Sequence, residues 1–418
     1  MERDDLAAVL GHFEGFALVG VTREPAATPP RLVLELAAVA GAPKRCSRCD
    51  GLVAVVHEVV VRQVRDLPVG DWDTWVRFPR ARVECPQCGP TVEAVPWLDR
   101  YQRMTRRLAD KIARLAQILP IQHVATWFGV SWDTVKQIDQ RALLARLGPV
   151  DATTLAGVRV LAMDEFAIQK GHRYATVIIE PRTRRVLWVG RGRSRADVRP
   201  FFELLGPAGC AQIEAVAMDM SGSYADEVRA QCPQAAIVYD LVHVVARYGR
   251  EVIDRVRVDE TNRVARANGP NDRPTRRLRR VIKGTRWLLL RNRATVTAPK
   301  DRVRLRDVLA ANRALFTVYV LKDDLKQLWG FTYPKAALRF WRQWYHRATH
   351  SRIPALVTFA RNLMRYLPGI LSRCRFKLHT SVLEGINNKI KVIKRMAYGF
   401  RDDAYFFLKI RAAFPGIP

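Results

Sequence analysis

The sequence predicts a multidomain α/β protein: a mixed β-sheet with flanking helices, interrupted by an all-α insertion and preceded by a β-rich cysteine module and a helix-turn-helix. Three observations predict this class. Two C-x-x-C pairs lie before residue 100, a helical period of apolar residues begins near residue 103, and apolar runs in the order βββαβαβ follow residue 156. At 418 residues, the chain is long enough for roughly two to four domains.

Composition and charge indicate a polyanionic partner. Lys and Arg number 70 against 40 for Asp and Glu, so the net charge is +30, while hydrophobic residues make up 49% of the chain and can fill real cores. Such a chain suits nucleic acid, with a membrane surface as the competing polyanion. No apolar run approaches the roughly 18 residues of a membrane-spanning helix, and the start MERDDLAAVLGHFEG is acidic where a signal peptide is basic. We therefore expect a soluble, cytoplasmic protein without a membrane partner.

Residues 1–100 form the predicted N-terminal module. Its four cysteines have the spacing of two knuckles that together hold one Zn²⁺ in a tetrahedral site: Cys46, Cys49, Cys85 and Cys88. Strand-like segments between the pairs can bring the knuckles together. Because sulfur would fill all four positions and leave none for water, the zinc is expected to be structural. The alternative is a set of reduced cysteines that bind no metal.

Residues 101–150 have the pattern of a helix-turn-helix. Gly129 supplies the turn, and Ser131 can cap the second helix and contribute to the DNA-binding surface. That helix would present four side chains to the major groove of DNA: Trp132, Asp133, Lys136 and Gln137. Helical hairpins of this kind also serve as plain packing units, which is the alternative.

Residues 151–246 carry the predicted mixed sheet. The first apolar run stops at Asp164, and the fourth stops at Asp219. If the first and fourth strands are neighbours, the two carboxylates lie side by side, which makes sense mainly when a divalent cation lies between them. Asp164 could otherwise be only a polar residue at a strand end. Because strand side chains alternate, Glu165 is expected to face away from Asp164.

Residues 375–418 contain a candidate third acid. Between residues 379 and 400, apolar side chains fall on one helical face, and Glu384, Lys391 and Arg395 fall on the opposite one. A helix packed on the sheet edge could offer Glu384 to a metal while its basic side chains contact phosphates. The alternative is an ordinary solvated charged face.

Residues 247–374 are predicted to be a basic, all-α insertion. The run RPTRRLRRVIKGTRWLLLRNR suggests a surface that follows a phosphate backbone, and Trp287 within it is a candidate for touching DNA. A later aromatic stripe has helical spacing and is predicted to be core rather than a base-stacking platform: Phe340, Trp341, Trp344 and Tyr345.

The segments AMDEFAIQKG, AVAMDMSGSY, VYDLVHVV and LEGINNKIKVIKRMAYGFRD resemble those of the DDE transposases of bacterial insertion sequences, in particular the ISL-three family. The resemblance covers essentially the whole chain and implies an RNase H-like catalytic domain behind a zinc motif and a helix-turn-helix. Carried over by motif, the catalytic triad is Asp164, Asp219 and Glu384. The resemblance also adds Asp240 and His243, a D-x-x-H signature, to the catalytic set. On sequence alone, His243 could instead be a hydrogen-bonded core residue.

The resemblance implies a DNA transposase that binds the terminal inverted repeats of its insertion sequence. Cleavage and strand transfer on double-stranded DNA, at transposon ends and target, would use two Mg²⁺ held by the triad. A homodimer or higher homo-oligomer on DNA, associated with the bacterial nucleoid, is implied as well. One alternative is a regulator that keeps the zinc module and helix-turn-helix but has lost catalysis. Another is a structure-selective nuclease.

Overall fold

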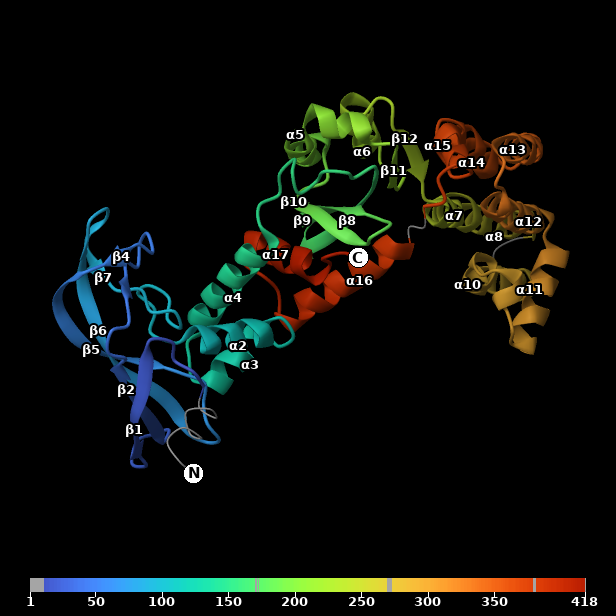
Figure 1. Cartoon of the computed structure of the whole chain (residues 1–418). Coiled ribbons are helices and arrows are strands. Elements are labelled where there is room, and N and C mark those ends of the chain that lie inside the picture. Colours follow the sequence, from blue (N-terminus) through green and yellow to red (C-terminus); the bar gives the residue numbers. More distant parts are fainter. Residues whose placement is uncertain (1–10, 170, 172, 269–272, 379–380, 418) are drawn as a thin grey trace. The chain divides into compact units, whose positions relative to one another are not determined.

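The structure is a computed structural model that describes residues 11–169, 171, 173–268, 273–378 and 381–417. Most of the acidic start noted above, residues 1–10, lies outside the described residues. The chain packs into two compact units, Met1–Leu147 with Met396–Gly399, and Gly148–Arg395 with Phe400–Pro418 (Figure 1).

The first unit contains a five-stranded sheet in the order β1-β2-β6-β5, with β7 paired to β6. Its strands are β1 (Phe16–Glu24), β2 (Arg31–Ala38), β5 (Val55–Arg65), β6 (Asp73–Cys85) and β7 (Gly89–Val92). Strand β6 pairs antiparallel with β5 along nearly all of its length and parallel with β2 at its start. On one face, Phe78 from β6 packs edge to face on Trp97, as does Phe13, in a small aromatic core. The strands predicted between the two cysteine pairs are confirmed.

Among the residues that the structure describes, a short ribbon and three helices complete this unit. They are β3 (Lys44–Arg45), β4 (Leu52–Val53), α2 (Arg106–Ala116), α3 (Ile121–Phe128) and α4 (Trp132–Leu147). Helix α3 ends at Gly129, whose φ of +58° lies in the left-handed region that favours glycine. Ser131 Oγ accepts the N–H of Thr134 at 3.1 Å and so caps α4. Val124 and Val135 are buried against α2, and the predicted pair of helices joined by a turn is confirmed.

The second unit contains a mixed sheet in the order β10-β9-β8-β11-β12. Its strands are β8 (Val160–Gln169), β9 (Arg173–Glu180), β10 (Arg185–Arg191), β11 (Ala215–Met218) and β12 (Ala236–Tyr239). Strand β8 pairs antiparallel with β9 and parallel with β11. The predicted RNase H-like order, with the first and fourth strands adjacent, is therefore confirmed.

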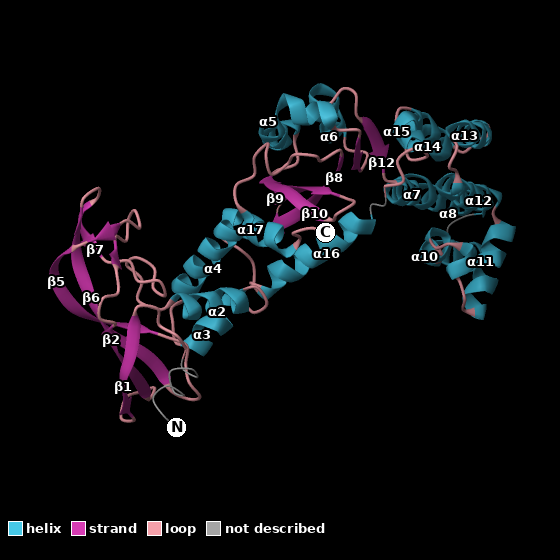
Figure 2. Ribbon diagram, in the orientation of Figure 1, coloured by secondary structure: helices cyan, strands magenta, loops and turns pink. Residues whose placement is uncertain are grey.

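Helices cover both faces of this sheet (Figure 2). Helices α5 (Arg195–Gln212) and α6 (Gly222–Gln231) cover one face, and α16 (Ser381–Met396) and α17 (Asp403–Ala413) cover the other. Strand alternation divides the β8 side chains between them: Met163 packs with Phe201 of α5, whereas Ala162 packs with Ile386 and Ile390 of α16.

The helical character predicted for residues 247–374 is confirmed. The helix α7 (Leu241–Tyr248) leads into this region, which contains α8 (Asp254–Asn268), α9 (Arg273–Gly284), α10 (Arg286–Leu290), α11 (Pro299–Ala311), α12 (Arg313–Lys326), α13 (Pro334–Thr349), α14 (Pro354–Met364) and α15 (Leu367–Ser372). Trp341 and Trp344 are each 1% exposed and stack with ring centroids 5.2 Å apart, so the aromatic stripe belongs to the core as predicted. Among the described residues, no helix is both long and apolar enough to span a bilayer.

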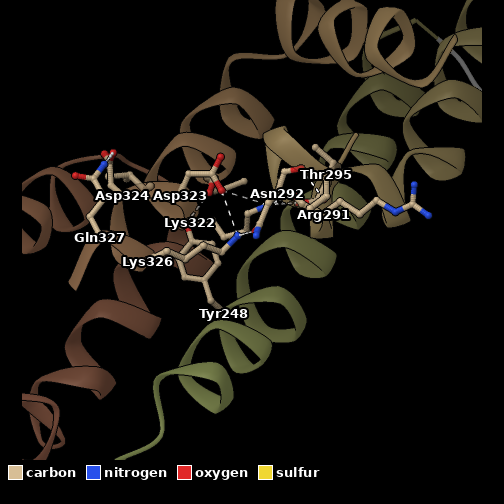
Figure 3. Close-up of polar contacts among 12 residues, drawn as sticks. Tyr248, Arg291, Asn292, Thr295, Lys322, Asp323, Asp324, Lys326 and Gln327 are labelled. Carbon is tan, nitrogen blue, oxygen red and sulfur yellow. Dashed lines mark hydrogen bonds and ion pairs between the residues drawn. The ribbon is translucent and has the colours of Figure 1, made fainter. Parts of the chain in front are cut away.

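Two lysines of α12 anchor the segment that follows α10 (Figure 3). Lys322 is 1% exposed, and its Nζ donates to the carbonyl oxygens of Leu289 at 2.6 Å and Arg291 at 2.7 Å. Lys326 donates to Asn292 Oδ1. Burial lowers the pKa of Lys322 to about 7. These contacts satisfy carbonyl groups at the end of α10, the helix that carries Trp287.

Candidate active site

Asp164, on β8, and Asp219, directly after β11, lie level with each other on neighbouring parallel segments. Strands β8 and β11 pair with Ala162 opposite Ala217, and each acid follows two residues later. Both alanines belong to the core beneath α16. Because strand side chains alternate, the two acids are directed to the same face as these alanines.

Two donors hold the Asp164 carboxylate. The N–H of Glu165 donates to Asp164 Oδ1 at 2.8 Å, and Nδ2 of Asn387, on α16, donates to Oδ2 at 2.7 Å. Burial, together with the charges of Asp219 and Glu165, raises the pKa of Asp164 to about 6, although the Glu165 N–H and His243 act in the opposite direction. Burial is therefore the main reason that the pKa of this carboxyl is raised.

Asp219 is held at the start of α6. The N–H of Ser221 donates to Asp219 Oδ1 at 3.0 Å. Burial and, after it, the charge of Glu165 raise the pKa of Asp219. The turn from β11 into α6 thus fixes the second acid beside the first.

Glu384 comes from the exposed side of α16. The apolar side of this helix, with Ile386 and Ile390, is buried on the sheet, and Glu384 lies about one turn before Asn387. The three predicted acids line one hollow of about 540 Å³, together with Asn387 and Lys391 among others. Packing of α16 on the sheet is what brings Glu384 to the aspartates.

Asp240 and His243 border the same hollow at the start of α7. Asp240 caps the helix, since its Oδ1 accepts the N–H of Val242 at 2.8 Å. His243 Nε2 lies 3.6 Å from Asp240 Oδ2, and the His243 side chain is 50% exposed. His243 is therefore not the buried core residue of the alternative interpretation.

Glu165 was expected to face away from Asp164, and its contacts agree with this expectation only in part. Its Oε1 accepts a hydrogen bond from Arg193 Nη1 at 3.1 Å, away from Asn387 and α16. Glu165 nevertheless borders the hollow, and its charge raises the pKa of both Asp164 and Asp219. The hollow lies beside β8 at the carboxyl ends of β11 and β12, where a long side chain from the opposite face can still reach its border.

The donor set suits a hard divalent cation. Carboxylate oxygens are the ligands that Mg²⁺ prefers. Asn387 Oδ1 is buried beside them and has no hydrogen-bond partner in the described part of the chain. The three carboxylates are spread around the hollow. Among the described residues, the group of three or more His, Cys, Asp or Glu side chains whose ligand atoms all lie within 4.8 Å of one another is the cysteine cluster. The three acids do not form such a group.

The four predicted zinc ligands converge in the first unit. The sulfur atoms of Cys46, Cys49, Cys85 and Cys88 all lie within 4.8 Å of one another, and Cys49 Sγ is 3.6 Å from Cys85 Sγ. With zinc–sulfur bonds of about 2.3 Å, tetrahedral geometry puts the sulfurs about 3.8 Å apart, so the cluster fits the ion. The Arg48 N–H donates to Cys46 Sγ at 3.3 Å. Against the effect of burial, such N–H groups lower the pKa of Cys46 to about 6.

The side chains predicted to read DNA lie at the start of α4 and are accessible. Trp132 is 44% exposed, and Lys136 Nζ lies 5.8 Å from the centroid of its ring. Ser131 and Gln137 are exposed on either side.

The remaining DNA-contact candidates belong to the second unit. Trp287 is 68% exposed, with the Arg286 guanidinium 5.1 Å from the centroid of its ring. Lys391 lines the hollow and donates to Asn388 Oδ1 at 3.2 Å. Arg395, one turn further along α16, is exposed.

Sequence reasoning missed two polar side chains. Asn387 holds Asp164, and its position three residues after Glu384 on the same helix was the signal that could have identified it. Glu227 is fully buried and accepts from Arg195 Nε at 2.5 Å and Arg199 Nε at 3.0 Å. These bonds fix α6, which follows Asp219, to α5, and no local sequence pattern indicates them.

Comparison with known proteins gives matches over most of the chain. Residues 161–410 match the ISL3 DDE model described as "Transposase", residues 93–143 match the helix-turn-helix domain of transposase family ISL3, and residues 42–88 match the zinc-finger of transposase IS204/IS1001/IS1096/IS1165.

Named relatives agree with these matches. The chain is 52% identical over 372 residues, 89% of either chain, to the transposase for insertion sequence element IS1001 of Bordetella parapertussis. It is 30% identical over 374 residues, 86% of this chain and 83% of the relative, to the transposase for insertion sequence element IS1557 of Mycobacterium tuberculosis.

Proposed function

The chain belongs to the ISL3 family of insertion-sequence transposases, and we propose that Asp164, Asp219 and Glu384 hold its catalytic metal as a pair of Mg²⁺ ions. As a DDE transposase, the protein cleaves DNA and transfers strands with a divalent metal, and its four-cysteine ribbon holds a structural zinc. The observation that carries the proposal is the meeting of three acids from β8, the end of β11 and α16 at one hollow.

The bound metal supplies positive charge that activates the attacking oxygen and stabilises the departing one. The chain itself orients the ligands. The Glu165 N–H and Asn387 fix the two oxygens of Asp164, and the Ser221 N–H fixes Asp219. Lys391 adds a cation at the wall of the hollow, where it can bind a phosphate of the DNA strand.

Asp240 and His243 are assigned to the same catalytic set. Their support is geometric: both border the hollow, and Asp240 lies 3.6 Å from His243 Nε2. A carboxylate at this distance can help to orient the ring. His243 is accordingly assigned to bind phosphate or move a proton at the reacting strand.

Recognition of the terminal inverted repeats is assigned to the zinc module, residues 1–100, and the helix-turn-helix, residues 101–150. The start of α4 would enter the major groove, with Ser131 contacting backbone and three side chains reaching the bases: Trp132, Lys136 and Gln137. The insertion, residues 247–374, would hold flanking DNA through its basic surface and Trp287. Arg395 would bind phosphate beside the catalytic hollow.

The catalytic domain is assigned to residues 151–246 and 375–418 together. The protein is further proposed to act as a homodimer or higher homo-oligomer on transposon-end and target DNA. Because that DNA is the bacterial chromosome, the site of action is the cytoplasm, at the nucleoid.

The test is cleavage of the element's own flanking DNA in Mg²⁺ by three variants: Asp164→Asn, Asp219→Asn and Glu384→Gln. Each keeps the side chain's shape but removes a charge from the proposed metal site. Each should lower cleavage and strand transfer by several orders of magnitude. DNA binding should be retained, because a charge that repels phosphate has gone.

Asp226→Asn is the matched control, since Asp226 is an exposed acid on α6 that pairs only with Arg229 among the described contacts. It should cleave at the wild-type rate. Wild-type activity in Glu384→Gln would move the third ligand elsewhere. A wild-type chain that binds the repeats tightly but never cleaves them would favour the inactive regulator.

A further inference from the structure

Strand β5 is an edge strand with apolar side chains exposed on both of its faces. Val59 is 58% exposed, Val60 44% and Val61 65%. These side chains alternate across the strand, so neither face of β5 is covered here. The strand contains neither Pro nor Lys, two residues that commonly protect an exposed edge from pairing.

The outer side of β5 also has backbone hydrogen-bonding groups that no other described segment uses. Val61 lies opposite Pro79, which has no N–H. Val59 lies opposite Ala81, whose N–H donates to Glu93 Oε1 at 2.7 Å and whose C=O accepts from the Glu93 N–H at 3.0 Å. The N–H and C=O groups of Val59 and Val61 therefore point away from β6.

Arg65 supports this assignment of direction. Arg65 is an even number of residues from Val59 and Val61, so its backbone N–H and C=O point to the same side of the strand as theirs. The Arg65 N–H donates to the Arg103 carbonyl, and the Arg65 C=O accepts from the Thr105 N–H, both away from β6. Between Val55 and Val64, no strand of the described chain pairs with the outer edge of β5. A free edge of this length can accept another strand.

We propose that this edge pairs antiparallel with β5 of a second copy of the chain, with Val60 on the two-fold axis. In that register Val59 lies opposite the second copy's Val61, and the two exchange both backbone hydrogen bonds. Glu58 lies opposite Arg62 of the second copy, and the symmetry repeats this pair. Both side chains are exposed.

Charge complementarity is what selects a second copy and this register. With the two-fold axis at Val59, Glu58 would lie opposite Val60 of the second copy. With the axis at Val61, it would lie opposite Val64 of the second copy. Either shift loses both opposite-charge pairs. The present partner of Glu58 is Arg82 at 2.8 Å, and both of these side chains are at least half exposed, so little is lost if Glu58 turns to Arg62. The interface lies in the first unit and includes none of the proposed catalytic acids, so its failure would leave the proposed catalytic site untouched and would bear only on the proposed oligomer.

The test is analytical ultracentrifugation of the full-length chain over a range of concentrations. Wild type should dimerise. Glu58→Arg and Arg62→Glu each place like charges opposite one another twice, and each should raise the dimer dissociation constant about tenfold. An equimolar mixture of these two variants should recover association, because each mixed pair again joins Arg with Glu. Arg23→Glu, the same charge change on the opposite edge strand β1, should leave dimerisation unchanged.

Val61→Pro provides a second measurement that does not depend on charge. Because the Val61 N–H points away from β6, proline there removes a donor to the second copy while the β5–β6 bonds remain. Dimerisation should be lost while zinc content stays at the wild-type value. A monomeric wild type, a dimer indifferent to all these changes, or a mixture that stays monomeric would each overturn the proposal.

Discussion

Replacing Asn387 by Ala tests how the chain orients Asp164, the first of the proposed metal-binding acids. Nδ2 of Asn387 donates to Asp164 Oδ2 at 2.7 Å, and a hydrogen bond to a charged group contributes about 1.5–3 kcal/mol. The Glu165 N–H would still hold Oδ1, so Asp164 would keep its place but be free to turn about that contact. Because about 1.4 kcal/mol corresponds to a factor of ten in rate, we expect a loss of about 10- to 100-fold, well short of the loss from removing a triad acid.

The assay is single-turnover cleavage of end DNA over a titration of Mg²⁺, with DNA affinity measured in parallel. The loss should be expressed mainly as a higher Mg²⁺ requirement, since a mobile ligand binds a cation less well, and DNA affinity should not change. Asn362→Ala, which removes an exposed amide from α14, is the control and should behave as wild type. Cleavage by Asn387→Ala within about twofold of wild type at every Mg²⁺ concentration would refute the orienting role.

Three further predictions concern metal, packing and pH. Cys46→Ser should lose the zinc of the four-thiol cluster and, with it, specific binding of the terminal repeats; elemental analysis that finds no zinc in wild type would contradict this. Glu227→Gln should lower the free energy of unfolding by about 1–3 kcal/mol, because a buried carboxylate loses the charge that holds Arg195 and Arg199, both half exposed; an unchanged denaturation midpoint would count against it. Burial lowers the pKa of Lys322 from 10.5 to about 7, so the unfolded chain binds more protons between these values and stability should rise with pH across that window. Urea unfolding of Lys322→Met should show this rise reduced, and an unaltered pH dependence would exclude Lys322 as its source.

Much of the fold was predictable because it is recorded in short-range patterns. The strand order of the catalytic sheet follows from apolar runs and their spacing, and the helix-turn-helix follows from Gly129 and Ser131 at the junction of two apolar helical faces. The zinc ligands were identifiable because paired C-x-x-C turns restrict the local backbone. The helical insertion was predictable from its length and basic amphipathic character.

The sequence alone indicated the candidate residues for the proposed chemistry: the acids that end apolar runs, the four thiols and the family motif around Glu384. Tertiary structure decided what surrounds them. It brought α16 onto the sheet so that Asn387 bonds Asp164, buried Glu227 between two arginines, and left β5 open at the edge of its sheet. These outcomes depend on contacts between segments far apart in the chain. Whether a polar side chain is paired, buried or exposed is set by the packing of those segments, and local periodicity does not encode it.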